Sequence, residues 1–233
     1  MLKNLIFVAT TLAVAGSIAF AAPPIPASKL QRMGIVAGAT NFELTPRAQK
    51  RLLKKSLREC ERDKCANLDL RHLPITDLAV LSEMTHLKTL YLSYTDVDDL
   101  TPIRALTGIH ELHIGHTKIT DLAPITGFKN LTLLHIWGTE VSDFSAISGF
   151  TQLNELALSD TKIKSLGVLR PLKNLRTLAI KNVEIRDIRV LETLPKLRIV
   201  ETLHVDHFDQ RTLKRLKKRG VIVGLELTDQ IMC

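Results

Sequence analysis

The side chains best suited to recognising another molecule recur at intervals of 22 residues along this chain. Five of them occupy two positions of that interval, three residues apart: Tyr91, His113 and His135, then Tyr94 and His116. The only tryptophan, Trp137, follows two residues after His135. Tyrosine and tryptophan join an apolar body to a polar tip, and both are common hot spots of protein interfaces. The pattern therefore indicates recognition of a protein or peptide.

Chemistry other than recognition is only weakly indicated. His113 and His135, with Glu111 nearby, offer donor atoms that a transition metal such as Zn²⁺ accepts. Adjacent exposed histidines are seldom ligands, however, so we expect no metal and no other cofactor. The motifs of nucleophilic hydrolases, nucleotide-binding proteins and zinc peptidases are absent from the sequence. We therefore expect no catalytic residues and no enzymatic activity.

The elements that must position these side chains are six copies of one repeat, which follow each other without insertion or deletion from residue 65 to residue 197. In each copy two aliphatic residues stand two positions apart, as Leu90 and Leu92 do, and such side chains point to the same face of a strand. A threonine follows in most copies and is expected to bond backbone groups, and an aspartate is expected to cap a short helical turn. The segment from Ile109 to Leu122 shows the whole frame, L-x-x-L-x-L-x-x-T-x-I-x-D-L.

This frame resembles the leucine-rich repeat family, and its 22-residue length is similar to that of the class found in internalin-type proteins. The resemblance covers residues 65 to about 205. It implies an α/β fold, a solenoid with a curved parallel β-sheet on its concave face and short helical turns on its convex face. It also implies that the concave face is the working surface.

Four positions in each repeat flank the two strand aliphatic residues and are expected to be exposed on the concave face. They hold the only tryptophan, both tyrosines and four of the eight histidines, mostly in repeats two to four. Gly115 and Gly138 leave space beside Trp137, so we expect a shallow aromatic pocket with an acidic rim. The predicted partner-binding residues are Tyr91, Tyr94, Glu111, His113, His116, His135, Trp137 and Glu155.

This predicted site has two consequences. Alanine at Tyr91 and Trp137 is expected to abolish binding while the melting temperature stays nearly unchanged. The histidines predict that binding weakens or changes as the pH falls through about 6.5. The alternative is a concave face without a ligand, whose composition has drifted.

A helix is expected over residues 45–64, with Thr45 as its N-cap and Pro46 in its first turn. Its apolar face is expected to cover the open end of the solenoid core, and its other face is basic. Cys60 lies on the apolar face, and Cys65 occupies a core position of the first repeat. In an exported protein a disulfide between them would join this N-terminal cap to the repeats.

Residues 198–233 are expected to form the C-terminal cap, with a basic helix over 209–220 that ends at Gly220 and a closing strand over 221–225. The formal net charge of the chain is +8. Two basic cap helices suggest an alternative function, an envelope-associated protein that binds an anionic polymer or lipid. Nucleic acid is disfavoured because the basic residues lie mainly on the caps, the edges and the back of the solenoid.

Residues 1–21 have the features of a secretory signal peptide, in which Lys3 precedes an apolar run and Ala19-Phe20-Ala21 is a cleavage signature. Residues 22–44 begin with several prolines and indicate an exposed linker, with room for a short ordered piece at its end. The apolar run is short for a bilayer span, and no later segment is apolar enough, so we expect no membrane-spanning helix. We expect an exported protein, periplasmic or secreted and bacterial. Cys233 is then left over as a free or an intermolecular thiol.

Overall fold

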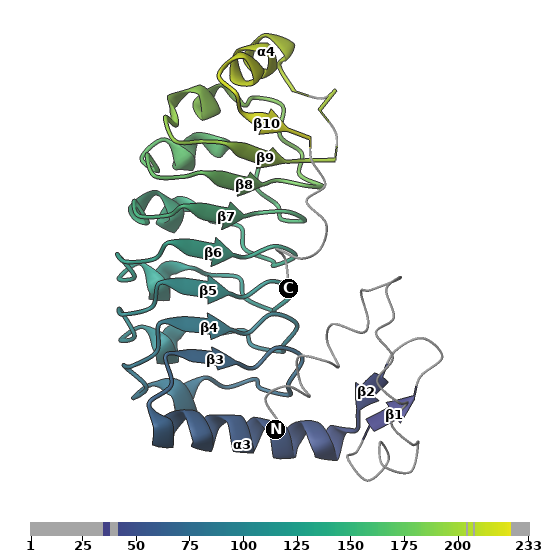
Figure 1. Cartoon of the computed structure of the whole chain (residues 1–233), viewed down its shortest axis with the longest axis vertical. Helices are drawn as coiled ribbons and strands as arrows, with labels where there is room; N and C mark the ends of the chain where they lie inside the picture. Colours follow the sequence, from purple (N-terminus) through teal and green to yellow (C-terminus); the bar gives the residue numbers. More distant parts are fainter. Residues whose placement is uncertain (1–34, 38–41, 204, 207, 225–233) are drawn as a thin grey trace, which may run out of the picture.

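Eight parallel strands, stacked in chain order, form the sheet that organises the molecule (Figure 1). In this computed structural model the described residues are 35–37, 42–203, 205–206 and 208–224. The predicted signal peptide, most of the predicted linker and Cys233 lie outside them. The strands are β3 (Asn67–Asp69), β4 (Thr89–Tyr91), β5 (Glu111–His113), β6 (Leu133–His135), β7 (Glu155–Ala157), β8 (Thr177–Ala179), β9 (Ile199–Glu201) and β10 (Ile222–Val223).

Neighbouring strands from β3 to β9 pair in register with the repeat, so that Leu68, Leu90 and Leu112 lie side by side. The two aliphatic side chains predicted to point inward are buried in every one of the six repeats. The predicted parallel sheet is therefore confirmed. It also extends beyond the sixth repeat, because β9 continues the same register after β8, and β10 then pairs with β9.

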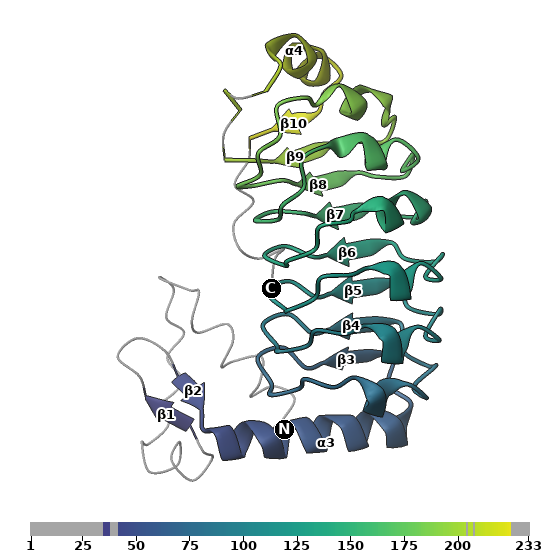
Figure 2. The same cartoon turned by 180° about the vertical axis from the view of Figure 1, so that it is seen from behind.

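Each turn returns to the next strand through a short 3₁₀ helix. These helices form a column along one side of the stacked strands in both views (Figure 1 and Figure 2). The Asp121 carboxylate accepts the backbone N–H of Ala123 at 2.8 Å, and the equivalent aspartates do the same in four other repeats. The Thr117 hydroxyl donates to the carbonyl of Ile114 at 2.7 Å, so it bonds within its own turn. The 3₁₀ helices are η1 (Ala79–Leu81), η2 (Thr101–Ile103), η3 (Ala123–Ile125), η4 (Ser145–Gly149), η5 (Leu166–Leu169) and η6 (Arg189–Thr193).

The helix α3 (Pro46–Asp63) lies across the first end of the stack, as predicted for an N-terminal cap (Figure 1). The short antiparallel strands β1 (Ile35–Ala37) and β2 (Phe42–Leu44) precede it. The Thr45 hydroxyl accepts the backbone N–H of Ala48 at 3.3 Å, which confirms the N-cap. The predicted Cys60–Cys65 disulfide is present. Three leucines of α3 pack against the solenoid core, Leu52, Leu53 and Leu57.

The helix α4 (Gln210–Lys218) covers the opposite end of the stack, and β10 closes the sheet beside it (Figure 1). Two basic side chains, one in this helix and one at its C-cap, bind the last repeat. Arg215 pairs with Glu192 at 2.8 Å, and Arg219 donates to the carbonyl of Leu194 at 2.7 Å. Part of the positive charge of this cap therefore has a structural role. Within the described ranges, no helix has the length and apolar character that crossing a membrane requires.

Candidate functional site

One row of rings crosses the neighbouring strands β4, β5 and β6 and consists of Tyr91, His113 and His135. These three residues pair in register across the strands. The Tyr91 and His113 rings stack with centroids 4.4 Å apart, and the His113 and His135 rings meet edge to face at 4.7 Å. The Arg71 guanidinium lies 5.1 Å from the centroid of the Tyr91 ring, which is the geometry of a cation–π contact. The three residues thus form one contiguous row across the sheet, here called the strand row.

A second row lies in the turns that follow the strands, and consists of His72, Tyr94 and His116. The centroids are 4.5 Å apart between the first two rings and 5.0 Å apart between the last two. All three residues have a positive φ, between +50° and +60°. Later members of the same repeat position also have a positive φ: Gly138, Asp160 and Asn182. Glycine, asparagine, aspartate and histidine are the residues that tolerate this conformation best, whereas a bulky tyrosine is unusual there. Backbone geometry thus accounts for the histidines of this turn row, but not for Tyr94.

Trp137 packs against the turn row. Its indole meets the Tyr94 ring edge to face at 5.3 Å and the His116 ring at 4.4 Å. It also forms a small apolar cluster with Ala157 and Ala179. A Cβ added to Gly115 would lie 2.4 Å from the indole, so the space left by this glycine is filled by Trp137.

The predicted aromatic pocket beside these glycines is therefore absent from the described structure. A Cβ on Gly138 would likewise lie 2.8 Å from the His116 ring, so the rings themselves occupy the space that the glycines leave. The prediction was wrong because it treated the aromatic side chains as pocket walls. In the solenoid each ring instead lies against the ring of the neighbouring turn.

The same stacking corrects the expectation that all four flanking positions are exposed. Trp137 is only 5% exposed, His113 7% and His135 1%. Tyr94 is 45% exposed, His116 is exposed, and Tyr91, Glu111 and Glu155 are half-buried. Strands about 4.8 Å apart bring each ring into contact with the next, so the inner rings are covered. Because the indole is buried, we now expect alanine at Trp137 to lower the melting temperature instead of leaving it nearly unchanged.

Acidic side chains flank the aromatic rows. Glu155 Oε1 lies 2.8 Å from His135 Nε2, and Glu111 accepts the Thr89 hydroxyl at 3.3 Å. Beyond them Glu201, which is 2% exposed, lies 3.5 Å from the Lys181 ammonium. Burial raises the pKa of Glu201, and the Lys181 charge opposes that shift.

Glu201 is absent from the predicted site, although extending the 22-residue repeat by one more strand would have identified it. It stands one repeat after Ala179, at the strand-row position of β9. His72 and Arg71 also join the aromatic rows without having been predicted as site residues. Both stand at the flanking positions of the first repeat. They were not predicted because tyrosine, tryptophan and histidine are concentrated in repeats two to four.

Burial has a strong electrostatic effect on the strand row. Burial is the main cause that lowers the pKa of His113 to about 3, and the neighbouring His135 and Arg71 contribute to this shift. His113 is therefore neutral at any physiological pH, and a transition near pH 6.5 is wrong for this residue. Three buried side-chain nitrogens in the described structure have no hydrogen-bond partner, and all belong to this cluster: His113 Nε2, His135 Nδ1 and Trp137 Nε1.

Two of the three side chains in the metal alternative of Glu111, His113 and His135 have other partners in the structure. His135 engages Glu155, and Glu111 engages Thr89. In the described ranges, the donor atoms that converge closely enough for a metal belong to a different group, Cys60, Cys65 and His86.

The contact between Gly115 and Trp137 makes a substitution test direct. We expect Gly115→Ala to lower the free energy of unfolding by about 1–3 kcal/mol, because the added methyl overlaps a buried ring that has no free space to enter. The fluorescence of the single tryptophan should also shift, since the indole must move. Urea unfolding and the emission spectrum of the native protein measure both effects.

Gly127→Ala is the matched control, because a Cβ there would meet only the Thr107 side chain at 3.5 Å, an ordinary contact. It should leave the emission spectrum as in the wild type. Equal effects of the two alanine substitutions would show that Trp137 does not lie on Gly115.

Comparisons with known proteins concern the fold. No family model matches the chain, and no curated protein matches it by sequence. An internalin (inlF) of Listeria monocytogenes is 28% identical over 70% of this chain and 48% of its own, with a TM-score of 0.60. Internalin C2 of the same organism is 22% identical over 76% of this chain and 84% of its own, with a TM-score of 0.55. The functional domain of its InlJ, which includes a cysteine ladder, is 20% identical over 61% of this chain and 32% of its own, with a TM-score of 0.51.

This chain spans about half the length of the internalin F structure and about a third of the InlJ structure. The chain therefore has a leucine-rich-repeat solenoid fold that is similar to that of the internalins.

Proposed function

We propose that this chain is an exported binding module that recognises a protein or peptide through its aromatic sheet face. The leucine-rich-repeat fold supports this proposal, because a solenoid presents an extended surface on a rigid stack of turns. The signal-like segment at residues 1–21 supports export to the periplasm or the medium. Binding, not catalysis, is the activity that this arrangement of rings suits.

The observation that carries the proposal is the conformation of Tyr94. Its backbone is in the left-handed region, with φ +60°, and its side chain is 45% exposed. A bulky residue in this region costs stability, and such outliers cluster at functional sites. His72 and His116 stack on the ring from both sides, and Trp137 supports it edge-on. The ring is thus held in one orientation before a partner arrives, which lowers the entropy cost of binding.

The predicted site residues divide into two roles in this proposal. Those with exposed surface would touch the partner: Tyr91, Tyr94, Glu111, His116 and Glu155. The buried ones would hold the exposed rings in place: His113, His135 and Trp137. Burial defines this division, because a side chain that is at most 7% exposed offers a partner almost no surface.

The test requires a variant that removes the Tyr94 ring and keeps the turn. Tyr94→Asn does so, because Asn182 occupies the same repeat position with φ +55°. Peptides would be selected from a random displayed library on the wild-type protein, and their affinities would then be measured by calorimetry. We expect Tyr94→Asn to weaken binding by at least about 30-fold, the effect of losing a hot-spot side chain.

Asp160→Asn is the control, because it lies at the same turn position outside the aromatic rows and keeps an oxygen that can accept from Asn182 Nδ2. It should bind the selected peptides as tightly as the wild type. Peptides that bind Tyr94→Asn with unchanged affinity would reject the proposed site.

A second candidate function rests on the basic surface of α3. Arg47, Lys50, Arg51 and Lys54 line one shallow surface there, and no ion pair involves any of them within the described structure. Such a surface suits an anionic envelope polymer or lipid. Salt separates the two candidates, because an exposed electrostatic contact is screened at high ionic strength and an aromatic contact is not. Ligands that remain bound at high salt favour the aromatic face.

A further inference from the structure

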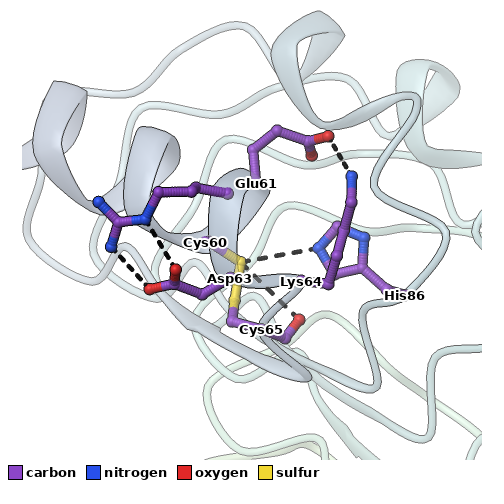
Figure 3. The surroundings of a disulfide bond; sticks show 7 residues. Cys60, Glu61, Asp63, Lys64, Cys65 and His86 are labelled. Carbon is purple, nitrogen blue, oxygen red and sulfur yellow. Dashed lines mark hydrogen bonds and ion pairs between the residues drawn. A yellow bond between two sulfur atoms is a disulfide. The ribbon is translucent and has the colours of Figure 1, made fainter.

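Three potential metal ligands meet where the N-terminal cap joins the repeats. Cys60 belongs to the last turn of α3, and Cys65 follows the left-handed residue Lys64 that ends this helix. His86 lies at the end of the first repeat, in the turn before β4, and its ring points at the disulfide (Figure 3). The donor atoms of the three side chains all lie within 4.8 Å of one another.

The distances suit tetrahedral zinc. With Zn–S bonds of about 2.3 Å and Zn–N bonds of about 2.0–2.1 Å, a tetrahedral ion holds two sulfurs about 3.8 Å apart and a sulfur and a nitrogen about 3.5 Å apart. The Cys60 Sγ to His86 Nε2 distance is 4.0 Å, and the two cysteine Cα atoms are 4.7 Å apart. Small side-chain rotations would therefore bring both sulfurs and the ring into position once the disulfide is opened.

The surroundings leave the ligands available. Cys60 is 3% exposed and packs in the core, whereas Cys65 and His86 are half-buried and give an ion access from solvent. The neighbouring carboxylates are engaged with cations of the same segment, Glu61 with Lys64 and Asp63 with Arg62 (Figure 3). Three protein ligands leave a fourth position for water, as in open zinc sites.

We propose that the reduced form of this junction is a zinc site formed by Cys60, Cys65 and His86. Two equivalents of a thiol reductant open the disulfide, giving two cysteine thiols and one oxidised reductant disulfide. Zn²⁺ then displaces the two thiol protons and binds two thiolates and the neutral His86 ring. The ion replaces the lost covalent link between α3 and the first repeat and adds a link, through His86, to the turn that precedes β4.

The junction would then have two alternative cross-links, a disulfide under oxidising conditions and a bound metal ion under reducing conditions. The zinc site is independent of the proposed recognition face, and the fold does not require it. Its physical basis is that a metal bound only by the folded chain stabilises the fold. The stability of the reduced protein should therefore depend on zinc, whereas that of the oxidised protein should not.

The experiment uses the full chain without a polyhistidine tag and with Cys233→Ser, so that the third thiol cannot contribute. The protein is reduced, freed of reductant under anaerobic conditions, and titrated with Co²⁺ as a spectroscopic probe and then with Zn²⁺. We expect one equivalent of Co²⁺ with thiolate charge-transfer absorption, displacement by Zn²⁺, and a zinc-dependent rise in Tm. The oxidised protein should show none of these.

Two variants separate the ligands from the background. His86→Ala keeps both thiols and should bind Zn²⁺ at least about tenfold more weakly, while His110→Ala, which changes a histidine outside the group, should bind as the wild type does. Circular dichroism of each reduced variant checks that it remains folded. Equal zinc affinity for His86→Ala and the wild type, or no binding by folded reduced protein, would overturn the proposal.

Discussion

Trp137→Ala is expected to lower the free energy of unfolding by about 3–5 kcal/mol, the range for removing a large aromatic side chain from a core. The indole is 5% exposed and contacts Tyr94, His116 and the Ala157–Ala179 cluster. Its removal leaves a cavity that the rigid strands cannot close, because the backbone spacing of the sheet is fixed. Urea unfolding followed by circular dichroism measures the loss without needing the tryptophan signal.

The control for this prediction is Tyr94→Asn, the variant that also tests binding. It removes a neighbouring ring that is 45% exposed, and it places a favoured residue at φ +60°, so we expect a change of less than about 1 kcal/mol. The two variants should thus have different effects. Trp137→Ala should mainly lower stability, and Tyr94→Asn should mainly weaken binding. A Trp137→Ala protein as stable as the wild type would mean that the indole is not a packing element.

The second large effect is a loss of stability in acid that originates at His113. Burial, with smaller contributions from His135 and Arg71, lowers the pKa of this ring to about 3 in the folded protein, whereas the ordinary pKa of a histidine side chain is 6.5. Between these two values the unfolded chain binds a proton that the folded chain does not, so protonation favours unfolding. The stabilising contribution is complete above pH 6.5 and is lost progressively as the pH falls towards 3, by up to about 1.4 kcal/mol per pH unit.

His113→Gln should flatten this part of the stability curve, because glutamine does not titrate. Urea unfolding of both proteins at several values between pH 7.5 and pH 4.5 gives the two slopes. His110→Gln is the control, since it changes a histidine outside the stacked rows, and its slope should match that of the wild type. Parallel curves for His113→Gln and the wild type would place the acid sensitivity elsewhere in the molecule.

Most of the fold follows from the sequence because its repeat is free of insertions. A constant interval between Leu68, Leu90 and Leu112 requires the same backbone path in each turn, and identical turns stack in register. The caps follow from local signals of the same kind, such as Thr45 before Pro46 at the start of α3. The predicted disulfide also depends mainly on sequence, because Cys60 and Cys65 are close in the chain and lie at a helix end.

The sequence predicts which residue types form the candidate site, but it does not predict how far each side chain is buried. The sequence alone places Tyr91, His113 and His135 in one row, since register is a property of the repeat. Whether a ring in that row is exposed depends on the size and direction of its neighbours in adjacent turns, which are contacts between residues far apart in the chain. Trp137 shows this dependence, because it lies over Gly115 and fills the space that the glycine seemed to leave open.

The sequence by itself therefore determined the solenoid, its register and the aromatic character of its sheet face. Tertiary structure alone decided that His113, His135 and Trp137 are covered while Tyr94 stays exposed, and that His86 lies beside the disulfide. The physical reason is the difference between periodicity and packing. Periodicity is a property of the spacing of residue types along the chain. Burial and side-chain contacts depend on the packing of turns that lie 22 residues apart in the sequence.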